Sequence, residues 1–285
     1  MVRMKKINNK AYEFCKKSLN LKTTPKYVKL QMEDFLKVCE GSDEKYIVCD
    51  EKVKQLENIL KILIMPKGLK AGQTLYECTT GYQWLFYTAI FCTVYRDNPK
   101  KRRYETGVLE ICRKNFKSFT KATILILLFL TEPKFSKFFS VVPDGALSRE
   151  IKEAISETIR TSPLVNEFGG YNRFKILRDT ITFLPKMSQY IPLSYSTSRM
   201  DDRLPNAFIA DEVGALPTSY VIEAMRSGQL NILNKIGFVI STKYPTIDNP
   251  FEDEVKYSKK VLEMNPDLVY CTSRTTQKTG KQMML

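Results

Sequence analysis

The sequence of 285 residues contains no histidine, and its seven cysteines include no pair in Cys-x-x-Cys spacing. Without histidine, a Ser-His or Cys-His catalytic group cannot form. Zinc sites are built mainly from cysteine and histidine, so a zinc site is not expected either. An odd number of cysteines, mostly inside apolar stretches, is typical of reduced thiols.

Long hydrophobic runs are also missing. The longest apolar run, residues 122–130, is about half the length that a bilayer requires. The N-terminal residues include no apolar stretch of the kind found in signal peptides. We therefore expect a cytoplasmic protein that does not insert into a membrane.

Negative charge is in deficit, since 31 Asp and Glu residues stand against 45 Lys and Arg residues, a net charge of +14. This balance favours a polyanionic partner such as DNA or RNA, because basic side chains release counterions from phosphates. A lysine excess inherited from an AT-rich genome is the alternative, and the scatter of lysines among Asn and Ile agrees with it.

Hydrophobic periodicity divides the chain into two parts. Residues 1–73 are predicted to form a helical module, because apolar residues recur there at spacings of three and four. Its predicted helices cover residues 11–21, 26–40 and 50–64, and Asp50 is expected to cap the third. From residue 74 to residue 262, predicted strands alternate with predicted helices.

The alternating part begins with a loop and a buried helix at residues 82–95. The predicted strands are residues 108–112, 137–142, 207–210 and 236–242, with an antiparallel pair in 173–184 and 188–194. The remaining predicted helices are residues 119–131, 147–160, 218–227 and 250–263. This alternation is typical of an α/β fold with a mainly parallel sheet and helices on both faces, whose ligands bind at the carboxyl ends of the strands.

The pair Lys117 and Ser118 lies between a predicted strand and a predicted helix, which is the layout of a phosphate-binding loop. The lysine would reach the β- and γ-phosphates, the serine would hold Mg²⁺, and the helix N-terminus would face the anion. Phe116 stands where such a loop needs glycine. A phenylalanine with positive φ is costly, so we expect either an ordinary loop conformation or weak nucleotide binding.

Two carboxylates, Asp211 and Glu212, end the predicted strand 207–210. Successive side chains at a strand end point in different directions, so Asp211 could hold Mg²⁺ through water while Glu212 polarises the attacking water. An acidic helix N-terminus is the alternative for the pair alone. After a phosphate-binding loop in an alternating chain, the pair favours ATP hydrolysis.

Three further polar residues stand at ends of predicted elements. Gln83 begins the helix 82–95, and its amide could pair with an adenine edge, although the sequence alone favours a capping or solvent-facing role. Ser241 and Thr242 end the strand 236–242, where they could sense the γ-phosphate or simply cap the loop.

The order of these motifs resembles the ATPase part of the large terminase subunit of tailed phages, in the HK97-like branch. Residues 75–84 are similar to the segment with the adenine-contacting glutamine, 108–118 to the Walker A loop, and 208–216 to the Walker B strand. Residues 227–231 and 237–242 resemble the coupling segments, and 43–72 the helices before them. The resemblance covers roughly residues 25–262 and implies a P-loop NTPase fold of the ASCE (RecA-like) type.

The resemblance also implies a function and a set of site residues. The expected function is an ATP-driven motor that moves double-stranded DNA into a procapsid, as a homo-oligomeric ring with a portal protein and a small terminase subunit, in the host cytoplasm. An arginine finger would be Arg113 or Arg149, and Glu212, Lys117 and Arg113 would be catalytic. The expected ATP-binding residues are Gln83, Arg113, Lys114, Asn115, Phe116, Lys117, Ser118 and Phe119, with Mg²⁺ on Ser118 and Asp211.

The chain departs from this family after residue 262, where complete large terminases continue into a nuclease. Residues 263–285 are predicted to be an irregular tail, and no nuclease activity is expected. Suitable codons for this tail, read in a shifted frame, could encode an acidic segment like the start of that nuclease, so our hypothesis is a frameshifted gene. The alternative functions are a remnant that keeps the fold and DNA or partner binding with little ATPase activity, and a helicase-like P-loop ATPase.

Overall fold

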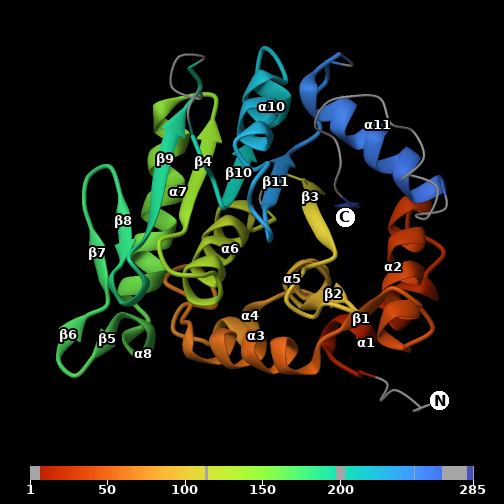
Figure 1. The fold of residues 1–285 in the computed structure, drawn as a ribbon, viewed down its shortest axis with the longest axis horizontal. Coiled ribbons are helices and arrows are strands. Elements are labelled where there is room, and N and C mark those ends of the chain that lie inside the picture. Colours follow the sequence, from red (N-terminus) through yellow and green to blue (C-terminus); the bar gives the residue numbers. More distant parts are fainter. Residues whose placement is uncertain (1–6, 113–114, 197–202, 247, 265–280, 285) are drawn as a thin grey trace.

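A computed structural model describes residues 7–112, 115–196, 203–246, 248–264 and 281–284. Its centre is an eight-stranded sheet in the order β12-β3-β11-β10-β4-β9-β8-β7 (Figure 1). The strands are β3 (Tyr104–Glu110), β4 (Lys137–Val142), β7 (Phe174–Ile176), β8 (Ile181–Phe183), β9 (Ser188–Ser194), β10 (Ala207–Asp211), β11 (Ile236–Ser241) and β12 (Lys281–Met284). Neighbours from β12 through β9 are parallel, which confirms the predicted mainly parallel sheet.

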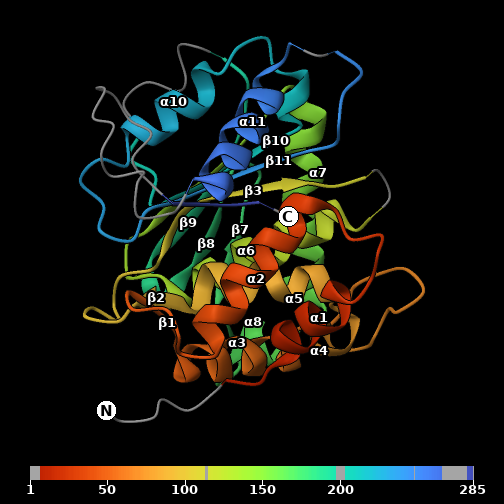
Figure 2. The ribbon, with the colours of Figure 1, turned by 90° about the vertical axis from the view of Figure 1, so that its right-hand side faces the viewer.

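Helices cover both faces of the sheet, as predicted. One face carries α5 (Gly81–Cys92), α6 (Lys117–Thr131) and α7 (Gly145–Arg160), and the other carries α10 (Tyr220–Ser227) and α11 (Pro250–Glu263) (Figure 2). Strand β10 shows why both faces are covered. Its successive side chains point to opposite faces and join two different hydrophobic clusters. Ala207 and Ile209 join the cluster with α6, whereas Phe208 and Ala210 join the cluster with α10.

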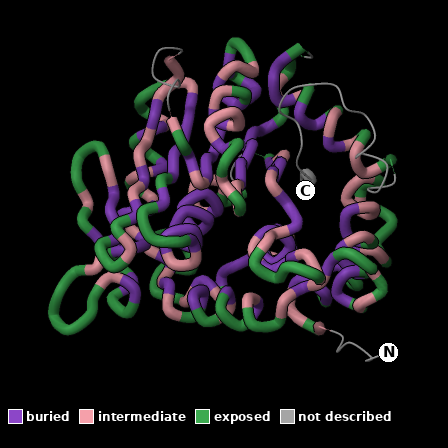
Figure 3. Tube along the Cα trace, viewed as in Figure 1, coloured by how far each residue is buried: buried purple, intermediate pink, exposed green. Residues whose placement is uncertain are grey.

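The central strands are buried along their whole length. Every residue of β10 and β11 is buried, as expected for parallel strands covered on both faces (Figure 3). None of the helices in the described ranges has both the length and the hydrophobicity needed to cross a membrane.

The N-terminal helices pack on the same core as the sheet. They are α1 (Lys10–Leu19), α2 (Lys26–Cys39), α3 (Asp50–Ile62) and α4 (Leu75–Cys78). Their apolar faces belong to one hydrophobic cluster that continues through α5 and α6 to strand β11. Residues on both sides of residue 73 thus contribute to one hydrophobic core. The division of the chain into a helical module (1–73) and an ATPase domain (74–262) stays a prediction.

Several predicted boundaries in this part are wrong. The helix expected over 82–95 ends at Cys92, because Thr93–Tyr95 form strand β2, which pairs antiparallel with β1 (Tyr46–Val48). The apolar run had suggested a longer helix, but its last residues pair with a strand that is distant along the chain, and this pairing determines their conformation. Asp50 is the first residue of α3 rather than its cap, a position that still suits a negative charge.

The segment after α7 is also more divided than predicted. It contains α8 (Pro163–Asn166) and a hairpin of β5 (Glu167–Phe168) and β6 (Tyr171–Asn172). The expected strand 173–184 is two strands, β7 and β8, followed by a 3₁₀ turn η1 (Leu184–Lys186). The antiparallel prediction holds for β7, β8 and β9, but β9 also pairs parallel with β4.

The predicted irregular tail is wrong for its last described part. Helix α11 ends at Glu263 as expected, but Lys281–Met284 form β12 on the edge of the sheet, parallel to β3. An edge strand presents unpaired backbone groups, and these can recruit a segment without any hydrophobic pattern of its own. The rest of the tail, 265–280, lies outside the described residues.

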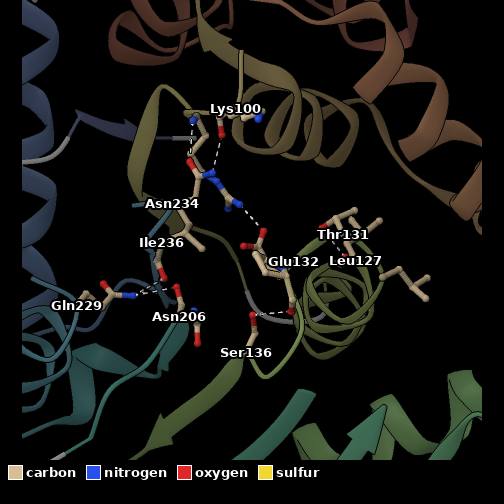
Figure 4. Close-up of polar contacts among 12 residues, drawn as sticks. Lys100, Leu127, Thr131, Glu132, Ser136, Asn206, Gln229, Asn234 and Ile236 are labelled. Atoms are coloured by element: carbon tan, nitrogen blue, oxygen red, sulfur yellow. Dashed lines mark hydrogen bonds and ion pairs between the residues drawn. The ribbon is translucent and has the colours of Figure 1, made fainter. Parts of the chain in front are cut away.

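A polar network joins the amino ends of the strands, opposite the loops (Figure 4). The guanidinium of Arg102, just before β3, forms a buried ion pair with Glu132 after α6. The Asn234 side chain accepts from the Arg102 backbone N–H at 3.0 Å and donates to the Lys100 carbonyl at 2.5 Å. The Gln229 amide donates to the backbone ahead of β10 and at the start of β11. These contacts join the segments that precede β3, β10 and β11.

Candidate functional site

The loop from β3 to α6 contains the predicted phosphate-binding motif. Strand β3 covers 104–110 rather than 108–112, and α6 begins at Lys117, so Lys117 and Ser118 form its first turn. Phe116 precedes them with φ 58° and ψ 27°, a left-handed conformation that favours glycine. The ordinary conformation that a phenylalanine would prefer is therefore not adopted. Of the other predicted residues in the loop, Arg113 and Lys114 lie outside the described part of the chain.

Hydrogen bonds to the helix hold Phe116 in this conformation. The backbone N–H and the hydroxyl of Thr120 both donate to the Phe116 carbonyl, at 2.8 and 3.0 Å. The hydroxyl of Tyr82, on α5, donates to the Asn115 carbonyl at 2.9 Å. Burial raises the pKa of Tyr82, so this phenol stays protonated and remains a donor. Helix α5 therefore positions the loop from the side.

Gln83 lies next to this contact but is buried within α5. Its side-chain oxygen accepts from the backbone N–H and the hydroxyl of Thr80, each at 2.9 Å, in a capping box. Its amide nitrogen donates to the Thr120 hydroxyl at 2.8 Å. Both polar atoms thus have partners, and the arrangement matches the capping interpretation. The predicted contact with adenine stays a prediction.

The two distant motifs meet at the carboxyl end of β10. Lys117 forms an ion pair with Glu212, and its ammonium nitrogen is 3.5 Å from Asp211 Oδ1. Lys121, one turn further along α6, forms an ion pair with the other Asp211 oxygen, Oδ2. Asp211 is 1% exposed, and its Oδ1 makes no hydrogen bond. The order of strands explains the meeting, because only β11 separates β3 from β10 in the sheet.

Glu212 adopts a strained backbone conformation at this point. Its φ is 51°, and it begins the 3₁₀ turn η2 (Val213–Ala215) that follows β10. The Tyr244 hydroxyl donates to Glu212 Oε2 at 3.3 Å, so one carboxylate oxygen faces Lys117 and the other faces Tyr244. Non-glycine residues in the left-handed region often mark functional sites. Phe116 and Glu212 are both of this kind.

The end of β11 is joined to the turn after Glu212. The Ser241 hydroxyl accepts from the Gly214 backbone N–H at 3.1 Å and donates to the Thr242 carbonyl at 2.9 Å. A Cβ at Gly214 would lie 2.4 Å from the Tyr244 ring, so only glycine allows that ring to approach. Ser241 therefore lies where a coupling residue was predicted, and sequence reasoning missed Tyr244. In the sequence, the only indication of a role for Tyr244 was the position of an aromatic hydroxyl shortly after the predicted strand 236–242.

The Ser118 hydroxyl makes a contact that the predicted metal site does not include. Its hydroxyl donates to Glu150, on α7, at 2.6 Å. Arg149, one of the two candidates for an arginine finger, is the exposed neighbour of Glu150. Phe119, predicted to contact ATP, packs with partial exposure against the core that α5 and α6 share. The structure thus shows a serine–glutamate contact that the sequence did not suggest.

The residues as arranged do not fit a resident Mg²⁺. Magnesium needs oxygen ligands in near-octahedral geometry. One Asp211 oxygen is held by Lys121, the other faces the ammonium of Lys117, and the Ser118 hydroxyl is bound to Glu150. In the described ranges, no group of three or more His, Cys, Asp and Glu side chains is arranged so that it could hold a metal ion. A metal on Ser118 and Asp211 would require these contacts to change.

The parallel sheet, the Lys-Ser turn at the start of α6 and the carboxylates at the end of β10 define an α/β protein of the P-loop nucleoside triphosphatase class, with a RecA-like sheet. The family model of the terminase large subunit ATPase domain matches residues 82–260, and the chain belongs to this family.

Comparison with solved structures agrees with this fold. The crystal structure of the HK97 bacteriophage large terminase matches 73% of this chain with a TM-score of 0.59 and 20% identity. The large terminase of a thermophilic bacteriophage matches 64% of the chain at 13% identity, but its TM-score of 0.41 is too low to bear on the fold. The chain matches 41% of the HK97 terminase's length and 39% of the thermophilic phage protein's length. No curated protein sequence matches this chain.

Proposed function

We propose that this chain is an ATPase that hydrolyses ATP to move double-stranded DNA into a phage procapsid. The observation that carries the proposal is the contact of Lys117 with both Asp211 and Glu212 at the carboxyl end of the sheet. A lysine at the start of a helix, beside two carboxylates, is the arrangement that ATP hydrolysis needs. The family membership supports the same interpretation.

In the proposed reaction, the γ-phosphate of ATP takes the place of Glu212 as the partner of Lys117. The carboxylate of Glu212 is then free to accept a proton from the attacking water, while Tyr244 keeps its other oxygen in place. The N-terminus of α6 would face the phosphates, and backbone N–H groups of its first turn would bind them. Ser241 would pass the change at Glu212 to β11, because its hydroxyl bonds the turn η2.

Mg²⁺ enters this proposal with ATP, as part of the substrate. The predicted ligands Ser118 and Asp211 have other partners, so no step of the reaction is assigned to a resident ion. The predicted roles of Arg113 or Arg149 as arginine finger, and of Lys114 and Asn115 in ATP binding, stay part of the proposal.

The proposed partners follow from charge and family. A net charge of +14 suits contact with the phosphate backbone of double-stranded DNA. A homo-oligomeric ring, a portal protein and a small terminase subunit are the partners expected of a packaging motor in the host cytoplasm. The chain spans less than half of the HK97 terminase, so these partners are proposed for the chain and not observed.

A remnant with little ATPase activity is the second candidate, and Phe116 favours it. Its left-handed backbone places a Cβ and a half-exposed ring beside the start of α6, where phosphates must approach. Weak nucleotide binding would follow, with the fold and DNA binding retained.

Steady-state ATP hydrolysis with and without double-stranded DNA separates the two candidates. We expect DNA-stimulated hydrolysis, reduced by about 100-fold or more in Glu212→Gln, because that change removes the proton acceptor. Binding of labelled ATP should persist in Glu212→Gln and be lost in Lys117→Ala. Hydrolysis no faster than that of Glu212→Gln, together with weak ATP binding by the wild type, would establish the remnant instead. Strand separation by the wild-type protein would point to a helicase-like ATPase.

A further inference from the structure

Lys121 is a buried lysine directly after the first turn of helix α6. It lies on α6, four residues after Lys117, so both ammonium groups project from the same face of the helix. Its side chain is only 3% exposed, and its ion-pair partner is Asp211. The following residues, 124–130, are all apolar. Lysines are almost never fully buried unless they are paired, so this position depends on the carboxylate.

The ammonium of Lys121 places a positive charge in direct contact with the Asp211 carboxylate, inside the protein. It contacts Oδ2, whereas Oδ1 faces Lys117 at 3.5 Å. Asp211 is therefore neutralised from within the protein before any metal or nucleotide arrives. This contact is the main reason why the site does not fit a resident Mg²⁺.

Among the described residues that contact one another here, this lysine balances the charges. Lys117 and Lys121 are positive, Asp211 and Glu212 are negative, and the four groups contact one another. The nearby carboxylate of Glu150 is on an exposed residue and is screened by solvent. Without Lys121, one unbalanced negative charge would lie below the phosphates of a bound nucleotide. Such a charge at about 6 Å weakens binding by roughly threefold to 100-fold, depending on the effective dielectric constant.

We propose that Lys121 is a built-in cation at Asp211, which lets the site bind ATP with little contribution from Mg²⁺ to the affinity. Lys121 is a positioning residue in this account, since it acts on the nucleotide through Asp211. The proposal rests on the proposed nucleotide site and adds which cation that site uses.

The test is equilibrium binding of a fluorescent ATP analogue to the full chain, in excess Mg²⁺ and in excess EDTA. For the wild type we expect the two dissociation constants to agree within about threefold, because no divalent ion is needed to balance Asp211. For Lys121→Met we expect binding in EDTA to be weaker than in Mg²⁺ by about tenfold or more. A wild type that binds more than tenfold better in Mg²⁺ overturns the proposal, as does a folded Lys121→Met with an unchanged ratio.

The matched control is the double variant Lys121→Met with Asp211→Asn. It removes one positive and one negative charge together, so the ratio between EDTA and Mg²⁺ should return to about the wild-type value. A ratio that stays at the value of Lys121→Met would show that the charge balance is not the cause. Circular dichroism confirms folding. If Lys121→Met fails to fold, the wild-type comparison still decides, because binding more than tenfold better in Mg²⁺ overturns the proposal.

Failure of this inference differs from failure of the proposed function. A wild type that binds the ATP analogue in neither buffer removes the proposed nucleotide site itself. A wild type that binds strongly only with Mg²⁺ keeps the nucleotide site and removes the role of Lys121.

Discussion

Replacing Phe116 with glycine should strengthen both the fold and the binding of ATP. Phe116 has φ 58°, and its side chain is 56% exposed, so the ring buries little surface that glycine would forfeit. A left-handed backbone costs a non-glycine residue about 1–2 kcal/mol. Glycine loses about 0.5–1 kcal/mol in conformational entropy on folding. The expected net gain in the free energy of unfolding is therefore about 0.5–1 kcal/mol.

This gain is measurable as a thermal midpoint. For a chain of this length, a gain of that size raises the midpoint by about 1–3 °C. The effect on ATP should be larger. Without a Cβ and a ring at residue 116, phosphate oxygens can approach the loop backbone, and one new charge-assisted hydrogen bond is worth about 1.5 kcal/mol, or about tenfold in affinity.

Phe135 offers a matched control for this change. It has φ 63° and an exposed side chain, but it follows α6 at the other end from the loop. Phe135→Gly should raise the midpoint by a similar amount and leave ATP binding unchanged. Phe116→Ala removes the ring but keeps the Cβ, so it should leave the midpoint nearly unchanged.

The outcome that refutes the reasoning is specific. If Phe135→Gly raises the midpoint and Phe116→Gly does not, the left-handed conformation of Phe116 is not a source of strain. If Phe116→Gly raises the midpoint but binds ATP no better than the wild type, the loop does not contact phosphates through residue 116.

Two further variants test other parts of the structure. Tyr244→Phe removes the hydroxyl that contacts Glu212 Oε2, so we expect kcat to fall by about threefold to tenfold with KM unchanged in steady-state assays; a rise in KM alone would place Tyr244 in substrate binding instead. Gly237→Ala puts a Cβ 2.4 Å from the ring of Phe208 in the buried sheet, and urea denaturation should show a loss of about 1–3 kcal/mol. Gly145→Ala is its control, because nothing lies within 4 Å of the added Cβ, and an equal loss there would contradict the packing argument.

The sequence predicted the parts of the fold that depend on local pattern. Strand β4 and helix α11 have the predicted bounds, because an apolar run with clear breaks identifies each. The meeting of Lys117 with Asp211 and Glu212 was also predictable, since parallel strands bring their carboxyl ends to one edge.

Contacts between segments that are distant along the chain could not be predicted from the sequence. The pairing of β1 with β2 and of β12 with β3 depends on which edges are left open, and no local pattern records that. The bond from Ser118 to Glu150 joins two helices whose relative rotation is set by packing. Lys121 did leave a signal, since a lysine inside an apolar helix requires a buried partner, but the identity of Asp211 needed the structure.

The order of strands in the sheet also determines when, during synthesis of the chain, each strand can pair with its neighbours. The partners of β3 in the sheet are β11 and β12, although β4 is the next strand of this sheet along the chain. From Glu110 to its partner Ser241, roughly 130 residues must be synthesised. At about 5–20 residues per second, this takes about 7–26 seconds. During this time the apolar strand that leads into the loop has no neighbour, so the nascent chain should be a client of ribosome-associated chaperones until β11 emerges.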